Sequence, residues 1–405
     1  MNIPEKNELS VRLNFAGNEI MVNARLSFNK PLKELTFILN NSLIIDKIEN
    51  NDYPVKWKKI DEFDFLSMVN SQRIKVTCKY PITELNLTYH GSIAGTSYYN
   101  VLTEAIKALS FYSVWFPQEF PFEINHDEVF IENGEDLFVV KGTFDEKNNT
   151  WHYGGEEFHP FNLALYEKNV INGDGFDPFN IIAYKKSALK TVSNDYFNVF
   201  YVDNSIEKYA QKAEEVYRNI VKFFNGSLFG KKELPILDIA CVSPALKTGG
   251  GYQRKGLMFA TDLGNDDLYL TWFLSHETAH NWCGGASVFT WEDWLNETTA
   301  EWAVLLYALN ENNDALFQSI IDGKIKKAGN YPPIKTKDGS RPEGVHDKGT
   351  ILFYEIYKKH GKDVVTKMVR GFTDLETKDT EHFIKMVEQE IGQEVANEIK
   401  KGIES

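Results

Sequence analysis

The chain has 405 residues, which is longer than a single hydrophobic core usually organises, so two domains are expected. Hydrophobic residues make up 42% and aromatic residues 14% of the composition, which is typical of a globular protein and excludes an intrinsically disordered one. The 44 basic and 58 acidic side chains leave a formal net charge of −14 at pH 7, which excludes nucleic acid and anionic membrane as expected partners.

Cysteine usage and the first residues indicate the compartment. The three cysteines, Cys78, Cys241 and Cys283, are odd in number and show no paired spacing, which is typical of a reducing environment. Residues 1–10 contain charges and no apolar core, so no signal peptide is predicted, and no stretch is long and apolar enough to span a membrane. We therefore expect a cytoplasmic protein.

Alternating apolar residues dominate the first half of the chain. Apolar side chains at every second position predict half-buried strands. The clearest runs comprise Ile20, Val22, Ala24, Leu26 and Phe28, then Leu35, Phe37 and Leu39, then Ile74, Val76, Cys78 and Tyr80, and finally Leu85, Leu87 and Tyr89. Strand-like segments continue at 138–140 and 197–202. Residues 1–203 are therefore predicted to form an N-terminal, sandwich-like β domain of mostly antiparallel sheet.

Helical periodicity replaces this alternation in the second half. Apolar residues between 206 and 221 follow helical spacing after a capping cluster at 203–205. Two short apolar runs at 234–242 and 256–260 predict strands, and helices are expected from 268 onward, with 382–405 as one amphipathic helix. Residues 204–405 are thus predicted to form the second, mostly helical domain of an α+β protein.

A pentapeptide in the second domain has the form of a metal site. His276 and His280 lie four residues apart in a stretch without proline or glycine, 268–282, so a helix would place both imidazoles on one face. Two imidazoles in that arrangement can bind one Zn²⁺, and Glu277 beside them can take a proton from a water molecule on the ion. These residues predict a hydrolytic zinc site.

A catalytic zinc needs a third protein ligand, and the next helix offers two carboxylates. Glu297 is the expected ligand, and Glu301, one turn later, could accept the free N–H of a liganding imidazole. The alternative for both is a solvated helix face. Cys283 is expected to be a small buried thiol. Three tryptophans are expected to pack the two helices together: Trp291, Trp294 and Trp302.

The segment 276–302, HETAHNWCGGASVFTWEDWLNETTAEW, resembles the zinc centre of the alanyl aminopeptidase and leukotriene hydrolase family of gluzincin metallopeptidases. Its most specific part is WLNE at 294–297, which favours Glu297 over Glu301 as the ligand, although the gap after His280 is shorter than usual in that family. The resemblance implies one Zn²⁺ per chain and a peptide or protein substrate. It also implies a saddle-shaped β domain followed by a thermolysin-like zinc peptidase domain, here with a short C-terminal helical extension.

Two substrate-facing motifs depart from the family pattern. The family's Gly-Ala-Met-Glu-Asn strand, whose glutamate binds the substrate α-amine, is matched by Gly250, Gly251, Tyr252 and Gln253, so an amide replaces that glutamate. A neutral amide accepts a weaker hydrogen bond from an ammonium than a carboxylate does, and Arg254 would repel one if it pointed inward. The alternative is a glycine-rich turn without a ligand.

The second departure is His346, which stands where the family's Tyr-x-Lys-Gly motif has its oxyanion-stabilising tyrosine. An imidazole can donate the same hydrogen bond, so His346 is a candidate catalytic residue. The alternative is a surface-loop histidine, and Tyr331 is a spare hydroxyl nearby.

The expected function is zinc-dependent peptide hydrolysis with altered recognition of the substrate N-terminus. The short stretch after Gly349 predicts no helical roof over the site, which together with Gln253 keeps an endopeptidase or a specialised processing peptidase as the alternative. A zinc-bearing binding protein without turnover is the remaining hypothesis. The presence of Glu277 argues against it, because a scaffold has no use for a base beside the metal.

Overall fold

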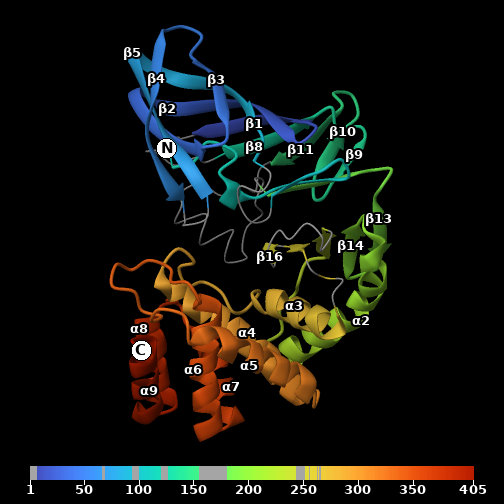
Figure 1. Ribbon diagram of the computed structural model, residues 1–405, viewed down its shortest axis with the longest axis vertical. Helices are drawn as coiled ribbons and strands as arrows, with labels where there is room; N and C mark the ends of the chain where they lie inside the picture. Colours follow the sequence, from blue (N-terminus) through green and yellow to red (C-terminus); the bar gives the residue numbers. More distant parts are fainter. Residues whose placement is uncertain are drawn as a thin grey trace, which may run out of the picture.

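The computed structural model describes residues 7–65, 69–93, 100–119, 126–154, 180–242, 251–254, 256–261, 263 and 266–405. Gly250 lies outside these ranges. Strands form the N-terminal half of the molecule and helices form the C-terminal half, as Figure 1 shows with the strands above and the helices below. Among the described helices, none combines the length and the apolar character that a membrane crossing requires.

A large, strongly curved sheet forms the N-terminal end. The long strands β2 and β5 pair antiparallel, and β2 alternates between buried and exposed residues along its first half, as the sequence predicts. β1 and β8 pair in parallel, which is an exception to the antiparallel prediction. The order is β10-β11-β8-β1-β2-β5-β3, with β4 also on β5. The strands are β1 (Glu8–Ala16), β2 (Glu19–Asn40), β3 (Ile44–Glu49), β4 (Val55–Phe65), β5 (Val69–Gly91), β8 (His126–Glu132), β10 (Thr143–Asp145) and β11 (Thr150–Gly154).

Two smaller sheets follow. The middle sheet has the order β6-β7-β12-β9, and the mixed sheet has the order β13-β14-β15-β17-β16 with parallel pairs at its centre. The middle sheet contains β6 (Val101–Leu102), β7 (Ile106–Leu109), β9 (Leu137–Val139) and β12 (Ile181–Lys185). The mixed sheet contains β13 (Lys190–Ser193), β14 (Phe197–Tyr201), β15 (Leu237–Cys241), β16 (Gly251–Arg254) and β17 (Leu257–Ala260).

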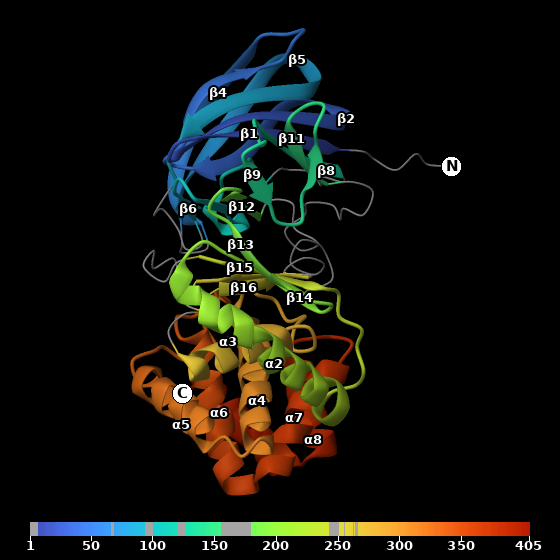
Figure 2. The ribbon, with the colours of Figure 1, turned by 90° about the vertical axis from the view of Figure 1, so that its right-hand side faces the viewer.

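The middle sheet is buried on both faces. Ile181 and Ala183 of β12 pack into one core with the large sheet, whereas Ile182 and Tyr184 pack into another core with the mixed sheet. Continuous burial of this kind requires an uninterrupted apolar run, and β12 reads IIAYK. The layers are therefore large sheet, middle sheet, mixed sheet and helices, and Figure 2 shows the mixed sheet between the β-rich half and the helices.

Helices α2 and α3 pack on the remaining face of the mixed sheet, and the other helices pack on α3 and on one another. The helices are α2 (Glu207–Phe223), α3 (Asp267–Ala279), α4 (Trp294–Asn310), α5 (Asp314–Ala328), α6 (Val345–His360), α7 (Lys362–Asp374), α8 (Thr380–Glu390) and α9 (Gln393–Ile403). The predicted single helix over 382–405 is wrong, because the chain breaks at Gly392, whose φ of 138° lies outside the helical region.

The predicted packing of the tryptophans between α3 and α4 stays a prediction. The Trp294 ring packs against Phe353 of α6 and Phe383 of α8, and the Trp302 ring packs against Phe353 and Tyr357, so these rings link α4 to α6 and α8. Trp291 lies in the 3₁₀ turn, Trp291–Asp293, that leads into α4. The division at residue 203 stays a prediction; β14, which precedes it, pairs with β15, which follows it.

Candidate metal centre

Helix α3 brings the two histidines together. Its N-terminus is capped by Asp266, whose carboxylate accepts a hydrogen bond from the Tyr269 amide, and it ends at Ala279. His280 continues the helical backbone with φ −61°, so the spacing of four residues sets His276 and His280 on one face. Their Nε2 atoms lie 3.3 Å apart.

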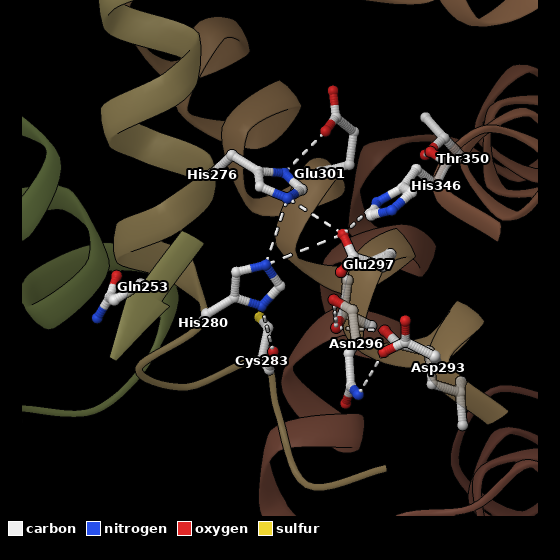
Figure 3. Close-up of polar contacts among 12 residues, drawn as sticks. Gln253, His276, His280, Cys283, Asp293, Asn296, Glu297, Glu301, His346 and Thr350 are labelled. Atoms are coloured by element: carbon white, nitrogen blue, oxygen red, sulfur yellow. Dashed lines mark hydrogen bonds and ion pairs between the residues drawn. The ribbon is translucent and has the colours of Figure 1, made fainter. Parts of the chain in front are cut away.

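Glu297, in the first turn of α4, completes a group of three. Its Oε2 lies 3.2 Å from His276 Nε2 and 3.9 Å from His280 Nε2, and Figure 3 shows the three side chains pointing toward one another. Two donor atoms on one tetrahedral zinc ion, each about 2.0–2.1 Å from it, lie about 3.3 Å apart. The three atoms all lie within 4.8 Å of one another, and two of the three separations match this ligand spacing, so a small shift of the His280–Glu297 pair fits them to a single zinc ion.

The second nitrogen of each imidazole is also held. Glu301 Oε2 lies 2.8 Å from His276 Nδ1, and the Trp272 indole donates to Glu301 Oε1 at 2.8 Å. His280 Nδ1 lies 3.1 Å from the Cys283 carbonyl oxygen, while the Cys283 thiol is buried. Because these contacts hold the Nδ1 atoms, both Nε2 atoms face Glu297. Hydrogen-bond partners of the second ring nitrogen usually orient a metal-binding imidazole in this way.

The pKa values of the two carboxylates at the centre, Glu297 and Glu301, lie below their usual range. Burial alone would raise the pKa of Glu301, but the Lys324 charge and the hydrogen bonds from His276 and Trp272 lower it to about 2. Burial would likewise raise the pKa of Glu297, yet nearby histidines, His346 first among them, hold it well below its usual value. Both carboxylates are therefore ionised at neutral pH.

Glu277, on α3, lies beside the group formed by His276, His280 and Glu297. Its side chain is buried, and burial raises its pKa, while the neighbouring His276 and His280 act in the opposite direction. A carboxylate whose pKa is raised binds a proton more readily, which suits a group that takes a proton from water and passes it on.

His346, in the first turn of α6, reaches the same centre. Its Nδ1 lies 2.7 Å from Glu297 Oε2, and its Nε2 lies 3.1 Å from the guanidinium of Arg341. Arg341 in turn pairs with the buried carboxylate of Asp293 at 2.7 Å. Lys324 of α5 donates to the His346 carbonyl at 2.9 Å. The structure therefore places His346 in contact with Glu297, one of the three candidate metal ligands, and not on a separate surface loop.

Arg341, Asp293 and Lys324 are the residues that sequence reasoning missed. Arg341 and Lys324 belong to segments with no periodic relation to the histidines, so no spacing pointed to them. Asp293 could have been found, because it lies directly before the helix that carries Glu297 and three residues before Asn296, whose amide donates to it. Tyr331, the spare hydroxyl, packs against Gly344, where an added Cβ would meet its ring at 2.2 Å.

Strand β16 forms one edge of the mixed sheet and lies against α3. A Cβ on Gly251 would approach the Phe273 ring of α3 to 2.6 Å, so only glycine fits there. The side-chain oxygen of Gln253 is buried and has no hydrogen-bond partner among the described residues. Tyr252 is buried and stacks on Phe259, so it contributes packing and could reach a substrate through its backbone.

The side chain of Arg254 points to the opposite side of β16 from Gln253. Side chains alternate along a strand, and the Arg254 guanidinium stacks over Tyr252 and donates to the Tyr112 hydroxyl at 3.1 Å. Tyr112 belongs to a 3₁₀ turn, Phe111–Ser113, in the β-rich half. Arg254 therefore faces the other half of the molecule and only its charge is felt at Glu277, whose pKa it helps to lower after the two histidines.

Another group of possible metal ligands lies at the end of α6. His360, Glu394 and Glu398 come close together, but the Lys359 ammonium pairs with both glutamates. A cation of the protein already occupies these carboxylates, so this group is an ion-pair cluster that links α6 to α9. It does not compete with the buried site on α3 and α4.

No protein-family model matches the chain, and no curated protein matches it. The chain is similar to the solved structure of an M1 zinc metallopeptidase from Deinococcus radiodurans bound to a Tyr-Ser-Ala substrate, with 14% identity and a TM-score of 0.61 over 99% of this chain and 93% of that chain. It is also similar to a two-domain M1 zinc metallopeptidase bound to L-tryptophan, with 14% identity and a TM-score of 0.59 over 99% and 94%.

A third similar structure is yeast LTA4 hydrolase in complex with bestatin, with 13% identity and a TM-score of 0.57 over 98% of this chain and 66% of that chain. At identities this low, the structural similarity shows the fold alone, and the chemistry depends on the residues at the site. The α+β prediction is confirmed, with a β-rich N-terminal half followed by a helical half. The chain therefore has the fold of the M1 zinc metallopeptidases, as the segment 276–302 indicates.

Proposed function

We propose that this protein is a zinc-dependent metallopeptidase with altered recognition of the substrate N-terminus. The observation that carries the proposal is the convergence of His276, His280 and Glu297 at distances that suit one zinc ion, with Glu277 next to them. The M1 fold supports it, because the similar structures are zinc metallopeptidases. A zinc ion at this site would polarise the scissile carbonyl and lower the pKa of a bound water toward about 7.

The residues of the chain supply the other steps. Glu277 takes a proton from the attacking water and later delivers it to the leaving amine. His346 donates a hydrogen bond to the carbonyl oxygen as negative charge develops there. Among the described residues, β16 is an edge strand that can pair with an extended peptide, and the oxygen of Gln253, which has no partner among them, can accept a substrate N–H.

Substitution of the proposed base tests this function. We expect Glu277→Gln to lower kcat about 10²- to 10⁴-fold, because proton transfer to and from a positioned group contributes that much, while the zinc content of the protein stays the same. Peptide hydrolysis and elemental analysis measure the two quantities. Glu390→Gln, an exposed glutamate on α8, is the matched control. Zinc-free protein as isolated, or full activity in Glu277→Gln, contradicts the proposal. Bound zinc without peptide hydrolysis in the unmodified protein favours a binding protein without turnover.

Recognition of the substrate N-terminus has its own test. A neutral Gln253 oxygen gains less from an ammonium than a carboxylate does, by about 1 kcal/mol, which is about fivefold in kcat/KM. We expect Gln253→Glu to raise kcat/KM for peptides with free N-termini by that factor over their N-acetylated forms. Gln389→Glu on the exposed face of α8 should not change the ratio.

The comparison of free and acetylated peptides also separates the two peptidase hypotheses. Gln253 and its neutral oxygen favour tolerance of an acylated N-terminus, as an endopeptidase or processing enzyme requires. Cleavage of free N-termini alone by the unmodified protein would overturn this part of the proposal and leave an aminopeptidase. Product masses from a mixed peptide library distinguish the two outcomes.

A further inference from the structure

The ring of His346 lies between two groups of fixed hydrogen-bonding polarity. Arg341 Nη2 lies 3.1 Å from His346 Nε2, and Glu297 Oε2 lies 2.7 Å from His346 Nδ1. A guanidinium has donors and no acceptor, so Nε2 must offer a lone pair to it. A carboxylate has acceptors and no donor, so Nδ1 must carry the proton. Both contacts select the same tautomer of His346.

Arg341 is itself fixed by buried groups. Its Nε and Nη2 both donate to Asp293 Oδ2, at 2.8 and 2.7 Å, and Asp293 is 2% exposed. The other oxygen of Asp293 accepts from the Asn296 amide at 2.9 Å, and Asn296 is anchored to both backbone groups of Ala286. Asn296 directly precedes Glu297 on α4. The contacts from Asn296 through Asp293, Arg341 and His346 to Glu297 therefore begin and end at one helical turn, and they fix the guanidinium relative to Glu297.

The opposite tautomer would be unfavourable at both nitrogens. It would set an N–H of His346 against an N–H of Arg341, and a lone pair of Nδ1 against the Glu297 carboxylate.

We propose that Arg341 is a positioning residue that holds His346 as the Nδ1–H tautomer. The Nδ1–H, which donates to Glu297 in this structure, is then the donor that a substrate carbonyl oxygen can share. The catalytic consequence rests on the proposed peptidase function, whereas the tautomer itself does not. Figure 3 shows the His346 ring turned toward Glu297 from α6, on the side of the centre away from Gln253.

Nitrogen NMR tests the tautomer directly. Protein labelled with ¹⁵N-histidine is studied above the usual imidazole pKa of about 6.5, both zinc-loaded and after chelation. His346 is assigned by loss of its signals in His346→Asn. We expect a pyrrole-type Nδ1 and a pyridine-type Nε2 in both forms. The reverse pattern in the unmodified protein overturns the proposal.

The variant that removes the arginine must not leave a buried charge behind. Arg341→Met is therefore made together with Asp293→Asn, because an unpaired Asp293 could unfold the protein by itself. We expect an Nε2–H population of His346 to appear in this double variant, with little change in the thermal midpoint. An unchanged NMR pattern overturns the role of Arg341. Arg341→Lys, which keeps a donor, should restore part of the Nδ1–H signal.

A kinetic cycle separates tautomer control from general structural support. We expect the double variant to lower kcat by up to about 10²-fold with KM little changed, because one oxyanion donor is worth about that much. In the His346→Asn background the same two changes should have little further effect, since an asparagine amide has no tautomers. An equal loss in both backgrounds overturns the proposal.

The tautomer of His346 and the peptidase function are tested separately. Loss of the Nδ1–H pattern in the double variant, in a protein with no peptidase activity, supports the tautomer assignment and overturns the proposed function. Peptidase activity with an Nε2–H pattern in the unmodified protein supports the function and overturns the further inference.

Discussion

His276 lies between two carboxylates, with Glu297 on its Nε2 side and Glu301 on its Nδ1 side. Burial alone would lower the pKa of His276, but the hydrogen bonds to both carboxylates raise it to about 10. In the protein without metal, the imidazole is therefore a cation at neutral pH. A zinc ligand must be neutral at the coordinating nitrogen, so metal and proton compete for His276 Nε2.

We therefore expect zinc uptake by the chelated protein to release about one proton from His276 between pH 7 and about 9. The raised pKa stabilises the metal-free fold fully below the unfolded value of about 6.5, and this contribution is lost as the pH rises through about 10. Apparent zinc affinity should accordingly rise with pH over that range. Calorimetry in buffers of different ionisation enthalpy measures the released protons.

Glu301→Gln is the matched comparison, because it removes one of the two carboxylates that hold the proton on His276. This variant should release a smaller fraction of a proton from His276 at the same pH. Equal release from both proteins would contradict the assignment of the proton to His276.

The residues around His276 show what a sequence can predict at this scale. His276, Glu277, His280 and Glu297 follow from local geometry, because residues four apart share a helix face and the WLNE context marks the next helix. Arg341 and Lys324 do not follow, since only tertiary packing brings their segments to the centre. The tautomer of His346 is likewise invisible until its two neighbours are known.

At the scale of elements, α5 connects α4 and α6, two of the three helices that carry groups of the metal centre. Lys324 of α5 lies 3.7 Å from Glu301 Oε2 on α4 and 3.3 Å from Asp347 Oδ1 on α6, and it also donates to the His346 carbonyl. Its side chain is 12% exposed, so these charges interact with little screening by solvent. The Lys324 ammonium thus holds both Glu301, which contacts His276, and the first turn of α6, which carries His346.

We expect Lys324→Met to lower the free energy of unfolding by about 3 kcal/mol, because it leaves Glu301 and Asp347 buried without their cation. Zinc affinity should fall about 10- to 100-fold, as is usual when a group behind a metal ligand is lost. Denaturant titration and competition with a zinc chelator measure the two effects. Lys326→Met, exposed on the same helix, should change neither quantity. Unchanged zinc affinity in Lys324→Met would show that Glu301 keeps His276 oriented without the lysine.

At the scale of the whole molecule, the middle sheet joins the two halves. The sequence predicts a strand at 138–140, where β9 of the middle sheet lies, and β14, β15 and β17 of the neighbouring mixed sheet appear where apolar runs indicate them. It does not predict that the middle sheet is covered on both faces, because an apolar run shows burial without showing which layer covers each face. The covering layers are set by pairings between strands far apart in the chain, such as β14 with β15.

Ile181 and Ile182 offer a matched pair for testing this layered arrangement. They are adjacent, isosteric and at most 1% exposed, yet Ile181 packs toward the large sheet and Ile182 toward the mixed sheet. Each substitution to alanine should cost about 2–5 kcal/mol, because each leaves a cavity in a close-packed core. The loss of stability should be similar in the two variants, but the cavity lies in a different core in each.

Hydrogen exchange should therefore separate the two variants. We expect Ile182→Ala to speed amide exchange in β15 and β17 and to raise KM, because the core it weakens also supports β16 through Tyr252. Ile181→Ala should speed exchange in β1 and β2 and leave KM unchanged, because the mixed sheet keeps its packing. The same exchange pattern in both variants would mean that the middle sheet transmits the loss of packing across its full thickness. The two halves would then open as one unit, and the edge strand beside the metal centre would depend on the whole β-rich half for its position.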